Sequence, residues 1–369
     1  MKPSINWLLV FIPISLAVEH LGQSPPPVVF FCAALAIIPI AALIVRSTGQ
    51  LATYTGDAVG GLLNATFGNA PELIIALVAL RAGQLEMVRA SIIGAILANL
   101  LLALGIAFLI GGIRHRNQTY NASASRAYST MMLLAAMSLA VPSAFSRYFA
   151  PGETIRQEAM LNIWVAAVLL AIYVLYLVYS LKTHPETFAS AGGQEGHGGG
   201  HGHGDAHGSG GKRWSLPRAL ASLVVASLLA AWMSEILVGA ADGTGKALGM
   251  SSVFIGIVFL AVVGGAAESG SAIAMGAKNK VDLSIGIAMG SSIQIALFIA
   301  PVLVFASYFI APAPLELSFG RAEVGTLFIG VIIGALVCGE GQSNWFKGAQ
   351  LITVYLIFAA MFYFMPEVN

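Results

Sequence analysis

Long apolar runs separated by short polar stretches make up most of this chain. Runs of about 17–25 apolar residues can cross a bilayer as helices. The pattern predicts about eleven spans, near residues 5–21, 28–45, 51–81, 87–112, 127–146, 160–181, 217–240, 250–277, 283–310, 323–339 and 347–365. The third and eighth are the long, glycine-interrupted spans, so each is predicted to be a helix broken near the membrane midplane. The fold class expected is an all-α integral membrane protein.

Composition excludes a water-soluble protein. Of the 369 residues, 57% are hydrophobic and 9% are charged, whereas soluble domains carry about 25% charged residues. The lipid bilayer is therefore the expected surrounding. A net charge of +1 without a basic patch argues against nucleic acid as a partner.

Basic residues predict the orientation of the chain. Twelve of the 18 Lys and Arg residues fall on the side that holds the N-terminus, and six fall on the other side. Because cytoplasmic loops carry the excess of Lys and Arg, the N-terminus is predicted to be cytoplasmic and the C-terminus outside. The expected location is the cell (inner) membrane, crossed many times.

An internal repeat emerges when the chain is shifted by 196 residues. The shift superimposes four pairs without a gap: Gly68 and Gly264, Glu72 and Glu268, Glu86 and Asp282, Gly94 and Gly290. Each copy would hold five spans, an odd number, so the second copy must enter the membrane in the opposite sense. The predicted organisation is a peripheral first helix and loop (1–27), a first five-helix repeat (28–181), a linker (182–216) and an inverted second repeat (217–369).

The linker is rich in glycine and histidine, and it is expected on the cytoplasmic side. Glycine at this density is typical of a flexible tether, which is the interpretation we favour. Neutral imidazoles at His197, His201, His203 and His207 also predict a weak site for zinc, nickel or copper.

Two intramembrane acids, Glu72 and Glu268, are the main candidates for chemistry. Each follows a glycine-containing break, and neither has a basic residue nearby in the sequence. Burying a carboxylate in the middle of a membrane helix costs roughly 2.5–3.5 kcal/mol, so such residues usually line ion or proton paths. A structural role, in which each acid only caps or kinks a helix, is the weaker alternative for a repeat-related pair. Glu235 in span seven is a further acid and a candidate for the proton path.

Polar side chains at matching depth are candidates for a second set of ligands. Asn69, Asn99, Ser291, Ser292 and Gln294 lie beside the acids or in the spans that follow them. Their oxygens, together with carboxylates, are the hard ligands that calcium prefers. Interhelical hydrogen bonding is an equal alternative for Asn99 and Gln294.

At these residues the chain resembles the calcium/proton exchangers of the CAX type, within the calcium/cation antiporter superfamily. The likeness rests on the stretch 60–73, on Gly264 to Glu268 continuing to 290–294, and on 341–348. It implies Ca²⁺ export driven by H⁺ entry, with Glu72 and Glu268 as alternately protonated and metal-bound ligands. It also implies two inverted five-helix repeats and no cofactor beyond the transported ions. Gly265 and Ser269 stand where the family's second motif usually has asparagine and histidine.

The favoured hypothesis is thus an antiporter, not an enzyme, that exchanges cytoplasmic Ca²⁺ for external H⁺ by alternating access. Exchange of Na⁺, K⁺ or a transition metal for H⁺ is the alternative. A passive channel and an intramembrane enzyme with an acid dyad are more remote.

Overall fold

The computed structural model describes residues 5–20, 24–55, 57–145, 155–188 and 213–365. Within these ranges, eight helices are long and apolar enough to cross a membrane, or nine if one bent pair counts as a span. The eight correspond to the predicted spans two, four, five, six, seven, nine, ten and eleven, and the bent pair to span eight. The remaining two predicted spans are the short apolar helix Ile5–His20 and the broken pair α3 and α4.

The longer helices make up most of the described chain. They are α2 (Pro26–Ala52), α5 (Leu85–Leu97), α6 (Leu104–His115), α7 (Ala122–Ala144), α8 (Ile155–Val178), α10 (Leu216–Leu248), α14 (Val281–Gln294), α15 (Ala300–Ile310), α16 (Arg321–Cys338) and α17 (Trp345–Phe364). Wider π-helical turns occur at Ala98–Ala103, Tyr179–Thr183, Ile255–Leu260 and Ile295–Ile299. The first of these joins α5 to α6, and the last joins α14 to α15, so each pair forms one continuous span.

The second predicted span is too short, and the third begins too early. Helix α2 continues to Ala52 rather than ending at 45. Its polar residues Ser47 and Thr48 are buried, and Thr48 Oγ1 donates to the carbonyl of Ile44 at 3.0 Å. A hydroxyl satisfied in this way does not end the helix.

Two helices break where the sequence predicts. Helix α3 (Asp57–Phe67) stops before Gly68, and α4 (Ala70–Arg81) begins two residues later. In the second half, α11 (Ser252–Phe254) leads through the π-helical turn into α12 (Ala261–Gly264), and α13 (Ala266–Ala277) follows Gly265. The segment Ser252–Gly264 is bent by 61° against Ala266–Ala277.

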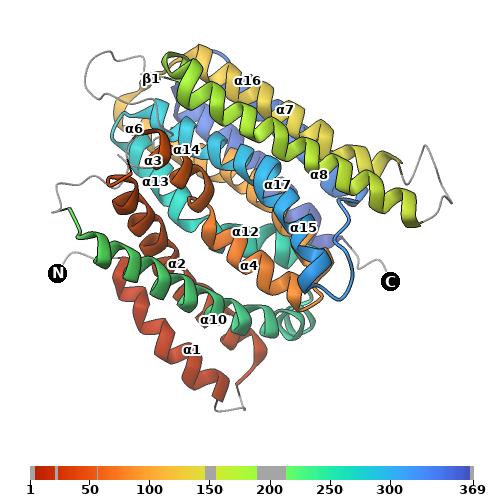
Figure 1. Ribbon diagram of the computed structural model, residues 1–369. Coiled ribbons are helices and arrows are strands. Elements are labelled where there is room, and N and C mark those ends of the chain that lie inside the picture. The colour runs from red at the N-terminus through yellow and green to blue at the C-terminus, as the bar shows by residue number, and fades with distance from the viewer. Residues whose placement is uncertain (1–4, 21–23, 56, 146–154, 189–212, 366–369) are drawn as a thin grey trace.

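Helices α4, α12 and α13 lie in the middle of the bundle, between two edges (Figure 1). At one edge α1 (Phe11–His20) packs against α2 and α10, and at the opposite edge lie α7, α8 and α16. The α2–α10 contact is filled by a buried cluster that includes Phe30, Ile37, Ile44, Met233 and Leu237. Helix α5 approaches the π-helical turn at Ile255–Leu260 so closely that a Cβ at Gly256 would lie 2.6 Å from the carbonyl oxygen of Met87.

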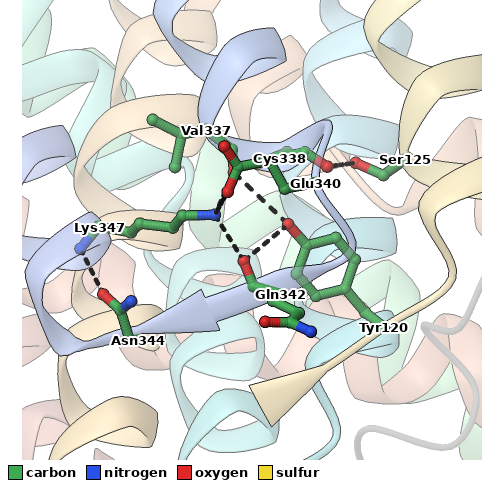
Figure 2. Close-up of polar contacts among 8 residues, drawn as sticks. All are labelled: Tyr120, Ser125, Val337, Cys338, Glu340, Gln342, Asn344 and Lys347. Atoms are coloured by element: carbon green, nitrogen blue, oxygen red, sulfur yellow. Dashed lines mark hydrogen bonds and ion pairs between the residues drawn. The ribbon is translucent and has the colours of Figure 1, made fainter. Parts of the chain in front are cut away.

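A small polar clamp joins the loops at one end of the bundle. Strand β1 (Asn117–Thr119) pairs antiparallel with β2 (Gln342–Asn344) and so ties the α6–α7 connection to the α16–α17 connection. Figure 2 shows Lys347 at its centre, with Nζ donating to Glu340 Oε2 at 2.6 Å and to the carbonyl of Gln342 at 2.7 Å. Tyr120 OH donates to the carbonyls of Val337 and Gln342, and Ser125 Oγ donates to the carbonyl of Cys338 at the end of α16.

Candidate cation site

The two predicted acids occupy equivalent places at the breaks. Glu72 is the third residue of α4, and Glu268 is the third residue of α13. A carboxylate in the first turn of a helix interacts favourably with the positive end of the helix dipole. Both side chains are nonetheless deeply buried, because Glu72 is 9% exposed and Glu268 is 1% exposed.

The break in the second half lies directly against Glu72. A Cβ at Gly264 would be 2.9 Å from Cγ of Glu72, and a Cβ at Gly265 would be 3.5 Å from Glu72 Oε1. Gly265 is also close to Asn99, whose Oδ1 would be 3.6 Å from the same Cβ. The carboxylate of Glu72 therefore reaches the backbone immediately before α13, the helix that carries Glu268.

The break in the first half meets the other half of the chain in a similar way. A Cβ at Gly68 would lie 3.7 Å from Oε1 of Gln294. The neighbouring Asn69 donates from Nδ2 to the carbonyl of Ser291 at 3.4 Å, and all three side chains are buried. Asn99 is the second residue of the π-helical segment that follows α5. Gln294 is the last residue of α14, directly before the corresponding π-helical segment. The π-helical widening, which often marks functional sites, thus occurs beside both amides.

Polar atoms without partners are concentrated at this place. Eight of the fourteen buried side-chain atoms that have no hydrogen-bond partner within the described residues belong to this group: both carboxylate oxygens of Glu72 and of Glu268, Asn69 Oδ1, Asn99 Nδ2, Ser291 Oγ and Gln294 Nε2. Buried polar groups are normally paired, because each unpaired one costs about 1–3 kcal/mol. Carboxylate, amide and hydroxyl oxygens gathered in this way form a suitable ligand set for a hard divalent cation.

The structure does not tie Ser292 to this group. Its side chain is fully buried, but Oγ donates to the carbonyl of Ala288 one turn earlier in α14, at 2.9 Å. The hydroxyl oxygen retains acceptor capacity.

A small cavity lies beside Glu72, between the first half of α4, α5 and the segments 260–261 and 295–303. Apart from Glu72 and Ser91, its walls are apolar: Ile75, Ala76, Ile92, Ala95, Leu260, Ala261, Ile295, Ile299 and Leu303. The cavity therefore adjoins one of the two acids, Glu72.

Glu235 lies apart from the two acids. Its side chain is 56% exposed, and Oε1 is 3.5 Å from Nη1 of Arg81. Arg81 is nine residues beyond Glu72 on α4, which corresponds to about 13 Å along the helix axis. The linker candidates His197, His201, His203 and His207 lie outside the described residues.

Ser47 was not among the residues predicted for the site. Its Oγ is buried and has no partner in the described structure. It lies on α2 beyond Ala41 and Val45, which pack against Ala267, the residue before Glu268. The prediction missed Ser47 because it placed the end of the second span at 45.

Comparison with known proteins reveals a family likeness over both halves of the chain. The family model described as sodium/calcium exchanger protein matches residues 26–182 and 218–364. A Ca²⁺/H⁺ antiporter of Aphanothece halophytica is 37% identical over 365 residues, covering 98% of this chain and 96% of the relative. The Ca²⁺/H⁺ antiporter ChaA of Bacillus subtilis is 35% identical over 360 residues, covering 96% and 97%. The solved structure of native YfkE superimposes with a TM-score of 0.82 at 32% identity, covering 98% of this chain and 100% of YfkE.

Proposed function

The chain belongs to the sodium/calcium exchanger protein family, and on that premise we propose that it exchanges cytoplasmic Ca²⁺ for external H⁺. The observation that carries the proposal is the buried pair Glu72 and Glu268, whose four carboxylate oxygens have no hydrogen-bond partner in the described structure. The relatives named as Ca²⁺/H⁺ antiporters align over nearly the whole chain and support this assignment. An exchanger moves ions without converting a substrate, so the protein is not proposed to be an enzyme.

The exchange follows from the cost of burying charge. Two unpaired carboxylates in a site with so little exposure cannot both remain ionised without a compensating charge. One Ca²⁺ neutralises both of them, and so do two protons. Calcium and protons therefore compete for the same two groups, and each ion leaves when the other arrives.

The ligand chemistry favours calcium over softer metals. The unpaired atoms that can coordinate a cation are oxygens of Glu72, Glu268, Asn69 and Ser291. Oxygen ligands suit Ca²⁺, whereas zinc and copper prefer imidazole and thiolate. We propose that Asn99 and Gln294 turn their amide oxygens toward the bound ion, with Ser292 as a further ligand.

Alternating access would rely on the two halves of the chain as inverted repeats. Three observations support this division: the two separate family matches, the two helix breaks, and the π-helical turns beside Asn99 and Gln294. We place the N-terminus in the cytoplasm and the C-terminus outside, on the distribution of basic residues. In this orientation α4 runs outward from Glu72, so the pair of Arg81 and Glu235 at the end of α4 lies toward the outer side.

The test uses inverted membrane vesicles energised to an acid interior. Addition of Ca²⁺ is expected to release protons from wild-type vesicles, and both Glu72→Gln and Glu268→Gln are expected to abolish the release. Glu186→Gln, at an exposed carboxylate outside the bundle interior, is the matched control and should leave release unchanged. Proton release that follows addition of Na⁺, K⁺ or Zn²⁺ but not of Ca²⁺ would show that Ca²⁺ is not the transported cation. Activity that survives both glutamate substitutions would refute the mechanism.

A further inference from the structure

Basic and aromatic side chains gather where α2 ends and α10 begins. The guanidinium carbon Cζ of Arg46 lies 5.0 Å from the centroid of the Trp214 ring, and Cζ of Arg218 lies 4.8 Å from the same ring. Cζ of Arg213 lies 3.9 Å from the ring centroid of Tyr54. We call these five residues the arginine–tryptophan cluster. Such contacts hold a guanidinium by its face against the π-system of the ring.

Part of the cluster is structural. Arg213 Nη2 donates to the carbonyl of Thr53 at 2.6 Å, and its Nε donates to Thr53 Oγ1 at 3.2 Å. The backbone N–H of Trp214 donates to Gln50 Oε1 at 2.9 Å. These bonds attach the start of α10 to the end of α2 and keep the indole ring in place, with only 9% of Trp214 exposed.

Arg46 and Arg218 have no such partners. Both are exposed, and neither forms an ion pair or side-chain hydrogen bond within the described residues. A guanidinium that stacks by its face still presents five N–H donors around its edge. The sequence contains no Asp or Glu in 24–55 or in 213–234, so the cluster has no acid of its own on these segments. Two guanidinium groups held at one indole ring, without an ion-pair partner among the described residues, are suited to bind the oxygens of a phosphate group.

The surface next to the cluster indicates the source of the phosphate. Val225 and Trp232 follow Arg218 at intervals of seven residues, which places them on the same face of α10. Both are apolar and exposed, Val225 by 53% and Trp232 by 47%. An apolar strip that runs from a basic cluster into the membrane can hold an acyl chain, which a free phosphate ion does not have. Tryptophan and basic residues at a helix end are also typical of the membrane interface.

We propose that the arginine–tryptophan cluster binds the headgroup phosphate of an anionic membrane lipid, with Arg46 and Arg218 as its donors. Anionic lipids concentrate in the cytoplasmic leaflet, and basic pockets between membrane helices recognise their headgroups. The bound lipid connects α2 to α10, the two helices that the cluster joins.

Lipid retention by the purified full-length protein tests this inference independently of ion exchange. The protein is equilibrated in detergent with equal amounts of phosphatidylglycerol and phosphatidylcholine, and retained lipid is measured by native mass spectrometry. Wild type is expected to retain phosphatidylglycerol preferentially. Arg46→Gln and Arg218→Gln should each lower that preference about fivefold. Arg126→Gln removes an exposed arginine from the start of α7 and should leave the preference unchanged.

Three results would overturn the proposal. The first is a wild-type protein without preference for phosphatidylglycerol, and the second is a preference that survives when Arg46→Gln and Arg218→Gln are combined. The third is displacement of the retained lipid by inorganic phosphate as effectively as by short-chain dihexanoyl phosphatidylglycerol. In that case the acyl chain contributes nothing, and the cluster is a site for a soluble anion. Size-exclusion profiles show whether the variants are folded. The preference and the displacement measured on wild-type protein do not depend on the variants.

Discussion

Glu72 lies so close to Gly264 that a side chain at position 264 would displace one of the two residues. A Cβ at position 264 would stand 2.9 Å from Cγ of Glu72 and 3.4 Å from its Cα. The two residues belong to different halves of the chain, and the contact brings the break before α13 against the first turn of α4. The glycine at 264 therefore determines how near the first carboxylate can come to the second.

Gly264→Ala is expected to move Glu72 and to impair exchange. The added methyl group meets the stem of a buried side chain in a packed interior, so either the carboxylate or the helix backbone must shift. A displacement of about 1 Å in such a site can cost a hundredfold in rate, and we expect a loss of about tenfold or more. Calcium-triggered proton release from vesicles measures the effect.

Gly270→Ala is the matched control for this substitution. Gly270 also belongs to α13, but nothing lies within 4 Å of its Cβ position. Alanine has the higher helix propensity, so the control should fold at least as well as wild type and should transport normally. Equal loss in both variants would mean that α13 tolerates no methyl group, and the contact with Glu72 would explain nothing.

Asn99→Leu is expected to separate function from stability. Asn99 is 2% exposed, and its Nδ2 has no partner in the described structure, so leucine removes a polar group that folding does not satisfy. Replacing an unpaired buried polar group by an apolar one is nearly neutral or stabilising. The melting temperature should therefore hold, while exchange falls about tenfold because the ion loses an amide contact.

Asn162→Leu should show the opposite behaviour. Asn162 is equally buried, but its Oδ1 accepts from the backbone N–H of Leu317 at 2.8 Å and its Nδ2 donates to the carbonyl of Glu158 at 3.0 Å. Leucine leaves both backbone groups without these partners, which lowers stability. If the two variants lose stability to the same extent, Asn99 has a structural role and is not a ligand.

The sequence singles out the two acids because charge is rare in an apolar chain. Glu72 and Glu268 stand out in their spans, and the glycines before them indicate where the helices break. The contact between Glu72 and Gly264 is not predictable in the same way, since it depends on how two halves of the chain pack. Spacing along one helix carries no information about its neighbour.

Polar residues that a helix satisfies internally are harder to predict. Thr48 looks like the end of a membrane span, yet it is buried within α2 and its hydroxyl donates to the carbonyl of Ile44. The hydroxyl of Ser292 likewise donates within α14, so only its acceptor capacity remains for an ion. A sequence does not distinguish a hydroxyl that donates to a carbonyl one turn earlier from one that is free to contact an ion.

The Glu340–Lys347 pair predicts a pH dependence of stability at the loop clamp. The hydrogen bond and the positive charge of Lys347 lower the pKa of the Glu340 carboxyl below its ordinary value. A carboxyl whose pKa is lowered by folding stabilises the protein above the unfolded pKa of about 4.3. This contribution is lost as the pH falls through the lowered pKa of the folded state.

Glu340→Gln is therefore expected to lower the melting temperature slightly at pH 7 and to have no effect at strongly acid pH. The effect is small because the Glu340 side chain is 71% exposed. Thermal unfolding in detergent across this range measures it, with Glu186→Gln as the exposed control. A difference that persists unchanged in acid would contradict an ionic origin.

Gly265→Asn would add an amide where the resembling family usually has asparagine. A Cβ at Gly265 meets Glu72 Oε1 at 3.5 Å and Asn99 Oδ1 at 3.6 Å, which are ordinary contacts, and the carbonyl of Ala261 at 3.2 Å. Because φ at Gly265 is −77°, the backbone accepts an L side chain without strain. The new amide oxygen would face the same ion as Glu72, and one further contact to a charged ligand is worth about 1 kcal/mol or more.

The half-saturating Ca²⁺ concentration of Gly265→Asn is thus expected to fall about fivefold. Gly265→Ala adds the Cβ without the amide and should leave that concentration near the wild-type value. Calcium titrations of proton release from vesicles compare the three proteins at one pH, so that competition from protons stays constant. An equal change in both variants would assign the effect to the methyl group's volume, and no change in either would place position 265 away from the bound ion.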